Sequence, residues 1–223
     1  VVGVSGMADE NLVPGRPFGG CAILWKKELN CKITPIKFTS RRVCGIVCEM
    51  EAFKTALINV YMPCDSVRES DASQEYCEIL SEISFKLEEL DVANIIVGGD
   101  FNTDLSRSES VNTRHLRSFV NNEILVCGLR LHGNNVDYTF ESKANSARST
   151  IDHFFVSESL FDNVTDYFVC HDGDNLSDHC PVTLRVDVQH NLNRNNDNTD
   201  LQVKINKPLW HRADENDLLK YKQ

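Results

Sequence analysis

One stretch, residues 94–104, constrains this chain more than any other. Its three β-branched residues at 95–97 predict a strand that is buried on both faces. The two glycines that follow end the strand, because they tolerate backbone conformations that a Cβ forbids. Asp100 and Asn102 lie just past the carboxyl end of this strand, where open α/β sheets bind their ligands. The two side chains suit acid–base chemistry or the stabilisation of an oxyanion. The alternative is an Asx-type turn, in which both side chains only form hydrogen bonds with the backbone.

The composition is that of a globular protein, with 41% hydrophobic and 25% charged residues in 223. This length fits one domain, or one domain with a tail. No apolar run approaches the ~20 residues of a membrane span, and no secretory signal opens the chain, so an intracellular location is expected. The net charge of −10 argues against a protein that coats nucleic acid. It does not exclude an enzyme that cleaves phosphodiesters, because such sites gather carboxylates around a divalent cation.

The nine cysteines do not form the pattern of a disulfide framework or a zinc site. Their number is odd, and no Cys-x-x-Cys pair or His-x-His cluster accompanies them. Most occur within apolar runs, where a free cysteine behaves as a small buried hydrophobe. The expectation is therefore a set of reduced thiols in a cytosolic or nuclear protein.

Short strands dominate the first part of the chain. Apolar runs separated by polar turns predict an antiparallel meander; its strands are 21–25, 32–38, 43–50 and 55–61. From residue 70 the apolar period changes to three and four residues, which predicts an amphipathic helix that leads into the strand at 95.

The rest of the chain alternates unevenly between helix and strand. A second helix is predicted over residues 114–126, with Gly128 as its stop signal. Strands are predicted at 129–132, 138–140, 151–156, 167–170 and 182–188. The pattern predicts an α/β fold in which helices face sheets of mixed strand direction.

The composition changes after residue 188. We expect one domain over residues 1–189, an asparagine-rich linker over 190–206, and the start of a following region over 207–223. No internal repeat is present.

Two further acidic clusters accompany Asp100. Asp152 lies within an apolar strand, which is a poor place for a lone carboxylate. Asp178 and His179 precede the last strand, and neighbouring residues of an extended chain point to opposite sides. The set is typical of a histidine held by one carboxylate, beside a carboxylate that binds a metal. Individually, Asp152 can also cap a loop, Asp178 can serve a turn, and His179 can be a surface histidine.

Four motifs, in order, resemble those of the endonuclease/exonuclease/phosphatase superfamily. They are Val60-Tyr61-Met62-Pro63, Gly99-Asp100-Phe101-Asn102, Ile151-Asp152-His153 and Ser177-Asp178-His179-Cys180-Pro181. Residues 15–24 and 149–153 are most similar to the endonuclease domains of non-LTR retrotransposons. The resemblance implies a DNase I-like fold, in which a sandwich of two β-sheets is flanked by helices in four layers. It also implies hydrolysis of a DNA phosphodiester with Mg²⁺ or Mn²⁺, in the nucleus, and a reverse transcriptase region in the same full-length polypeptide.

The resemblance also implies roles for individual residues. Tyr61 is expected to bond a phosphate oxygen, and Asp100 to position or deprotonate the attacking water. Asn102 is expected to stabilise charge on the phosphoryl oxygens. Asp152 is expected to orient His179, which acts as acid/base or binds the scissile phosphate.

Asp178 is expected to help hold the metal, directly or through water. Cys64 stands where the tyrosine–proline motif usually continues with asparagine, and a thiol is a poor hydrogen-bonding substitute. The family's opening strand with its asparagine, and its metal-binding glutamate, find no counterpart here, so we expect a chain that lacks the opening strands, aggregates readily and has weak activity or none. The alternatives are an abasic-site nuclease, another phosphodiesterase or phosphatase of the same superfamily, and a non-catalytic decayed remnant.

Overall fold

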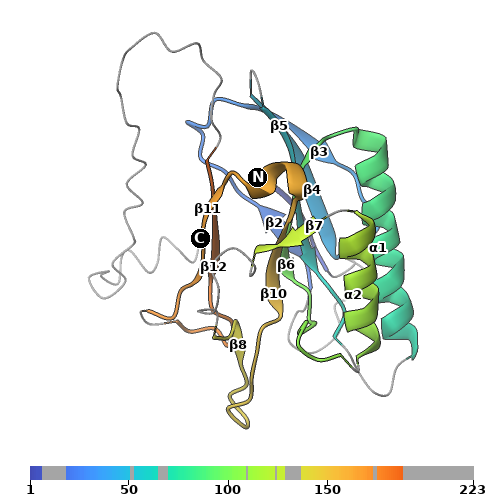
Figure 1. The fold of residues 1–223 in the computed structure, drawn as a ribbon, viewed down its shortest axis with the longest axis vertical. Coiled ribbons are helices and arrows are strands. Elements are labelled where there is room, and N and C mark those ends of the chain that lie inside the picture. Colours follow the sequence, from blue (N-terminus) through green and yellow to red (C-terminus); the bar gives the residue numbers. More distant parts are fainter. Residues whose placement is uncertain are drawn as a thin grey trace.

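A computed structural model describes residues 1–6, 19–50, 53–64, 70–108, 110–123, 125–128, 137–172 and 175–187 (Figure 1). The strand predicted at 129–132, the linker at 190–206 and the region at 207–223 lie outside the described residues. The division of the chain into these regions therefore stays a prediction.

A mixed six-stranded sheet forms the centre of the molecule, with the strand order β3-β4-β5-β6-β10-β7. Its strands are β3 (Lys32–Ile36), β4 (Val43–Met50), β5 (Phe53–Tyr61), β6 (Asn94–Asp100), β7 (Leu125–Cys127) and β10 (Asp152–Ser157). Strands β3, β4 and β5 pair antiparallel in sequence order, which confirms three strands of the predicted meander. The fourth, predicted at 21–25, forms a short strand (Cys21–Ile23) that pairs outside this sheet, so its place in the meander is wrong. β6 runs parallel to β5 and antiparallel to β10, so the sheet has mixed strand directions as expected.

Two helices cover one face of this sheet (Figure 1). They are α1 (Ser70–Leu90) and α2 (Val111–Asn122). Ile83 of α1 and Leu116 of α2 are fully buried and join the apolar side chains of β4, β5 and β6 in one core cluster. The apolar residues that recur at three- and four-residue steps in α1 therefore form the face that the helix buries, as predicted. No described helix is long and apolar enough to cross a membrane.

The predicted boundaries of the second helix are wrong at both ends. The helix begins at Val111, because the Ser110 side chain accepts a hydrogen bond from the backbone of Thr113 and caps the first turn. It ends at Asn122, and residues 125–127, which the prediction placed partly in this helix, form strand β7 and pair with β10. The pairing satisfies backbone groups at the edge of β10. Leu125 is buried in the strand, as it would also be on the inner face of a helix, so the apolar pattern does not distinguish the two.

The opposite face of the sheet carries a second layer of strands. It consists of β1 (Val2–Val4) paired with β2 (Cys21–Ile23), and β11 (Val164–Val169) paired with β12 (Val182–Val186). The first pair lies against β4 and β5, and β12 contacts β10. A short hairpin of β8 (Phe140–Glu141) and β9 (Arg148–Ser149) precedes β10, and the one-turn helix α3 (Glu158–Phe161) follows it. Strand β1 escapes prediction because three residues are too few to show a period.

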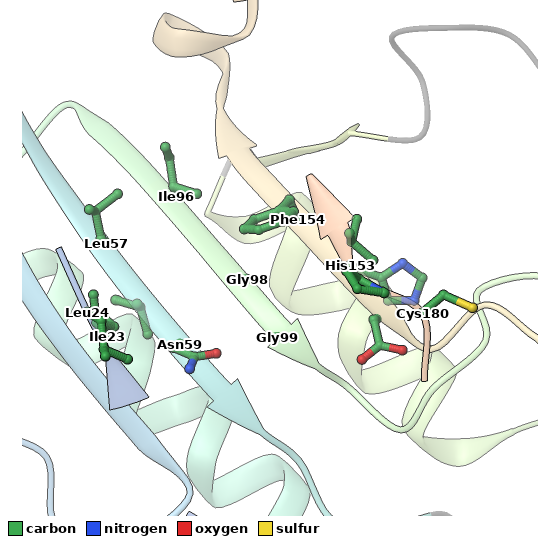
Figure 2. Close-up of a pocket in the computed structure, with 14 residues that line it drawn as sticks. Ile23, Leu24, Leu57, Asn59, Ile96, Gly98, Gly99, His153, Phe154 and Cys180 are labelled. Atoms are coloured by element: carbon green, nitrogen blue, oxygen red, sulfur yellow. The ribbon is translucent and has the colours of Figure 1, made fainter. Parts of the chain in front are cut away.

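An apolar groove of about 490 Å³ runs between the two strand pairs, over β5, β6 and β10 (Figure 2). Ile23 and Leu24 line one side and Val182 the other, and Ile96 and Phe154 belong to its lining. Leu24 is 77% exposed there. Among the described strands, β2 and β12 each have one hydrogen-bonded neighbour, so the second layer consists of two separate pairs.

Gly99 permits the close approach of β5 and β6 at the point where the acidic residues begin. Its φ of +137° is unfavourable for residues with a side chain, and an added Cβ would lie 2.1 Å from the carbonyl oxygen of Val60. Gly99 therefore does more than end the strand, because the close approach that it permits keeps Tyr61 paired with Asp100.

Candidate active site

The antiparallel pairing of β6 and β10 brings the first two predicted carboxylates together. Asp100 is the last residue of β6, Asp152 is the first residue of β10, and the two are directly opposite in the register. Phe101 then turns into the core with no exposed surface, which anchors the segment. Asn102 has a φ of +47°, in the left-handed region that asparagine tolerates better than most residues. The Asx-type turn that was the alternative interpretation is present as well, because the backbone N of Asn102 donates to Asp100 Oδ1 at 2.8 Å.

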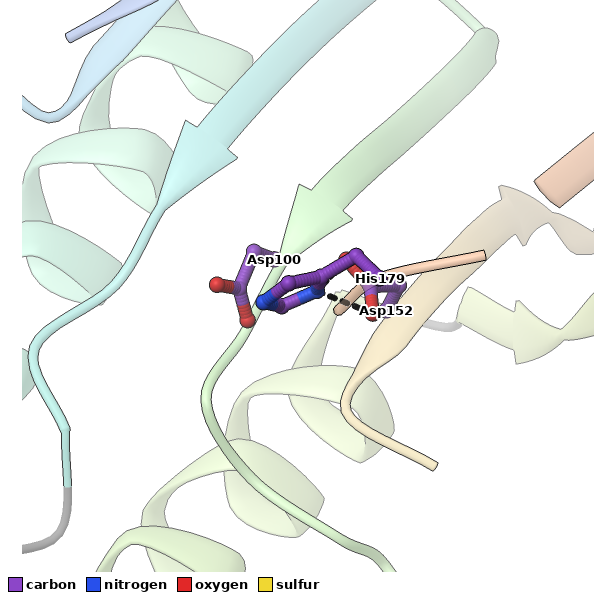
Figure 3. A group of neighbouring side chains, drawn as sticks. All are labelled: Asp100, Asp152 and His179. Carbon is purple, nitrogen blue, oxygen red and sulfur yellow. Dashed lines mark hydrogen bonds and ion pairs between the residues drawn. The ribbon is translucent and has the colours of Figure 1, made fainter. Parts of the chain in front are cut away.

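His179 reaches the same place from the segment before β12. Backbone hydrogen bonds tie this segment to the hairpin: Cys180 N donates to Thr139 O at 2.7 Å, and Glu141 N donates to Asp178 O at 2.9 Å. The Nδ1 atom of His179 lies 3.0 and 3.2 Å from the two carboxylate oxygens of Asp152 (Figure 3). With Nδ1–H donating to the carboxylate, Nε2 is the nitrogen that can exchange a proton with a substrate.

The electrostatics of the group favour proton transfer near neutral pH. Burial, and then the negative charge of Asp152, raise the pKa of Asp100 to about 6. The hydrogen bond to Asp152 raises the pKa of His179 above its ordinary value, against the effect of burial. Asp100 thus changes charge close to the pH at which a general base works best. His179 stays protonated to a higher pH than an exposed histidine does.

The same three side chains form a candidate cation site. One ligand atom each from Asp100, Asp152 and His179 lies within 4.8 Å of the others (Figure 3). Burial raises the pKa of Asp100 most, and the charge of Asp152 raises it further; a bound divalent cation would relieve the repulsion between the two carboxylates. Carboxylate oxygens suit Mg²⁺ and Mn²⁺, so the donor set fits the predicted metals.

Asp178 lies apart from this group. Its side chain is exposed and lines a second hollow together with Tyr138, Lys143 and His171. Asp178 is adjacent to His179 in the sequence, yet the two side chains face different surroundings, because neighbouring residues of an extended segment point to opposite sides. Its role as a metal ligand remains a prediction.

Tyr61 and Asn102 complete the predicted set beside Asp100. Tyr61 is paired with Asp100 across the parallel strands β5 and β6, and the Arg42 guanidinium lies 5.7 Å from its ring centroid. Burial, with the nearby groups of Cys64 and Asp100, raises the pKa of Tyr61, so the hydroxyl stays a donor. Asn102 Nδ2 donates to Met62 O at 2.8 Å and to Asp100 Oδ2 at 3.2 Å.

Two supporting residues are not found by sequence reasoning. Thr139 is fully buried, and its hydroxyl accepts hydrogen bonds from the backbone of Ile151 at 2.9 Å and of Asp152 at 3.0 Å. It therefore fixes the start of β10, where the Asp152 carboxylate lies. His153, the neighbour of Asp152, is 1% exposed and bonds Thr103 O through Nε2 at 2.9 Å. No sequence pattern indicates that a single threonine such as Thr139 will hold the start of a strand. The apolar neighbours of His153 predict that it is buried, but not which group it bonds.

His153 should make the fold sensitive to acid. Burial lowers the pKa of His153 below its ordinary 6.5, against the effect of the hydrogen bond to Thr103 O. Below pH 6.5 the unfolded chain binds a proton that the native imidazole does not, so the free energy of unfolding falls as the pH falls. Asp100 has the opposite effect, because its raised pKa favours the native state as the pH falls through about 6.

The two contributions are separable by substitution. Urea unfolding in chelator, at pH values from 8 to 5 in the Asp100→Asn background, should show a loss of stability toward low pH that His153→Gln reduces. Parallel stability curves for the two proteins would rule out this role of His153.

The fold and the site together define a class: an α/β sandwich with two carboxylates and a carboxylate-bound histidine at one edge, which is suited to hydrolysis. A family model described as the Endonuclease/Exonuclease/phosphatase family matches residues 5–179. The chain belongs to this family, whose members are nucleases and phosphatases. The comparison with curated proteins gives no match.

Several solved structures share the fold of this chain. A 3′ phosphatase, NExo, from Neisseria, bound to a product DNA hairpin, has 19% identity and a TM-score of 0.54, over 72% of this chain and 71% of that one. The endonuclease domain of TRAS1, a telomere-specific non-LTR retrotransposon, has 18% identity and a TM-score of 0.54, over 71% and 70%. An AP endonuclease from Leishmania major has 19% identity and a TM-score of 0.56, over 65% and 54%. These likenesses confirm the expected DNase I-like α/β fold.

Proposed function

We propose that this chain is a metal-dependent DNA-nicking endonuclease domain of a non-LTR retrotransposon. The observation that carries the proposal is the meeting of Asp100, Asp152 and His179, with the imidazole held by the Asp152 carboxylate at 3.0 Å. Three groups that are far apart in the sequence supply a base, an acid and a cation site within a few ångströms. In-line displacement at phosphorus requires this combination of positioning and charge neutralisation.

Each predicted side chain has a task in such a reaction. Asp100, with its pKa near 6, takes a proton from the attacking water. His179, oriented by Asp152, binds the scissile phosphate or gives a proton to the leaving oxygen through Nε2. Tyr61 donates its hydroxyl hydrogen to a phosphate oxygen.

Mg²⁺ or Mn²⁺ would be held by the site carboxylates, with Asp178 joining directly or through water, and would supply neutralising charge. Asn102 donates to the phosphoryl oxygens once one of its bonds to Met62 or Asp100 opens. Because three ligand atoms form a sparse cation site, we propose weak metal affinity and slow turnover for residues 1–223.

DNA is the proposed substrate. Support comes from the resemblance of residues 15–24 and 149–153 to retrotransposon endonucleases, and from the fold shared with the TRAS1 domain. The acidic net charge of −10 fits transient cleavage better than stable coating of DNA. We further propose that the domain ends near residue 189, that 190–206 link it to a following reverse transcriptase region, and that it acts in the nucleus.

Cleavage of supercoiled plasmid tests the proposal. Protein in excess over plasmid should convert it slowly to the open-circle form with Mn²⁺ or Mg²⁺, and EDTA should stop the reaction. Asp100→Asn is the control for a contaminating nuclease. Faster cleavage of a duplex with one abasic site would favour an abasic-site nuclease, and release of phosphate from a 3′-phosphorylated strand would favour a phosphatase. Absence of all three activities, together with no binding of Mn²⁺, would favour a non-catalytic remnant.

A further inference from the structure

Cys64 lies inside the candidate site, although its residue type does not suggest a role there. It follows β5 by three residues, in the segment that runs beside the Asp100–Asn102 turn. Met62 N donates to Asp100 O at 2.8 Å, which extends the β5–β6 pairing to this point. The Cys64 thiol donates to Asn102 Oδ1 at 3.3 Å. This sulfur–oxygen distance is short for a weak donor such as a thiol.

The bond from Cys64 completes the hydrogen bonding of the Asn102 carboxamide. The Nδ2 atom of Asn102 already donates to Met62 O and to Asp100 Oδ2. The Oδ1 atom accepts from Cys64, so both ends of the carboxamide are held at once. If the bonds from Nδ2 open to reach a substrate, the thiol is the contact that still fixes the group. The amide then turns about a held oxygen and does not swing freely.

We propose that Cys64 is a positioning residue, whose thiol holds the Asn102 carboxamide in the orientation required for turnover. This inference rests on the proposed function and deepens it. It also assigns a task to the residue that departs from the motif of the family, since the thiol still acts as a hydrogen-bond donor at this position.

The surroundings keep the thiol in its donating form. Burial, and then the charge of Asp100, raise the pKa of the Cys64 thiol, while the Arg42 guanidinium opposes them. As a whole the residue is exposed and lies outside the apolar core cluster, so it does not serve core packing. A cysteine that only filled space would not show the directed contact with Asn102 Oδ1.

Two substitutions at Cys64 show whether the rate depends on a hydrogen-bond donor at this position or on the sulfur atom itself. Cys64→Ala removes the donor and should lower kcat about three- to tenfold with little change in KM, as expected for one modest hydrogen bond. Cys64→Ser keeps a hydroxyl donor and should restore at least half of the rate. Cys77→Ala, at an exposed cysteine of α1, is the matched control and should have the rate of the unchanged protein. Equal rates for Cys64→Ala and the unchanged protein would overturn the proposal, and so would failure of serine to restore the rate.

A spectroscopic measurement distinguishes failure of this inference from failure of the proposed function. Nitrogen-15 relaxation of the Asn102 side-chain amide, measured without DNA or metal, should give a high order parameter in the unchanged protein. The value should fall toward the flexible range, below ~0.6, in Cys64→Ala and recover in Cys64→Ser. An unchanged order parameter in Cys64→Ala would refute the positioning role even if no protein cleaves DNA. A fall in the order parameter without any cleavage would support the contact and count against the proposed function alone.

Discussion

His179→Ala and Asp152→Ala should each lower the rate of plasmid nicking by about 10² to 10⁴, the usual range for a positioned acid or base. The double substitution should cost little more than the more severe single one, because the two side chains act as a unit through the 3.0 Å contact between Nδ1 and the carboxylate. The measurement is single-turnover nicking with protein in excess, which makes slow rates accessible.

The controls separate this pairing from general damage to the fold. His115→Ala changes a histidine of helix α2 that takes no part in the candidate site, and it should leave the rate unchanged. Thermal unfolding should show similar midpoints for the unchanged protein and His179→Ala, since the His179 side chain is 32% exposed and lies outside the apolar core. If the two losses multiply in the double variant, Asp152 has a task independent of His179, such as direct metal binding.

Phe101→Ala should lower the free energy of unfolding by about 3–5 kcal/mol, the cost of a large cavity at a buried aromatic. Phe101 has no exposed surface and packs edge-to-face on Phe155, with ring centroids 4.9 Å apart. Because it lies between Asp100 and Asn102, its loss should also release both side chains and abolish nicking. Urea unfolding checks the stability and the plasmid assay checks the activity.

Two variants show whether the effect depends on burial. Phe101→Leu keeps most of the apolar volume and should recover most of the stability. Phe85→Ala removes the same ring at a residue of α1 that is 56% exposed, and should change stability by no more than about 0.5 kcal/mol. A loss below about 1 kcal/mol for Phe101→Ala would mean that the site segment is anchored elsewhere.

Much of the fold follows from local patterns in the sequence. The period of α1, the meander of β3 to β5 and the buried strand β6 all appear where the residue pattern predicts them. The prediction fails at the end of α2, because a buried apolar residue such as Leu125 fits a helix face and a short strand equally well. Only the unsatisfied edge of β10 decides for the strand.

The candidate site divides in the same way between local and tertiary information. Local sequence patterns identify the candidate residues: a carboxylate and an amide after a strand and two glycines, an acid in an apolar strand, and a histidine before the last strand. These signals are local, because turn chemistry and burial pattern depend on near neighbours.

The tertiary structure alone decided which of these groups meet. The register of β6 and β10 places Asp152 opposite Asp100, and bonds from the hairpin turn His179 toward Asp152 while Asp178 faces another hollow. The contact of Cys64 with Asn102 has the same origin. Such pairings join segments distant in sequence, and their geometry arises from the packing of the whole sheet, which no local pattern encodes.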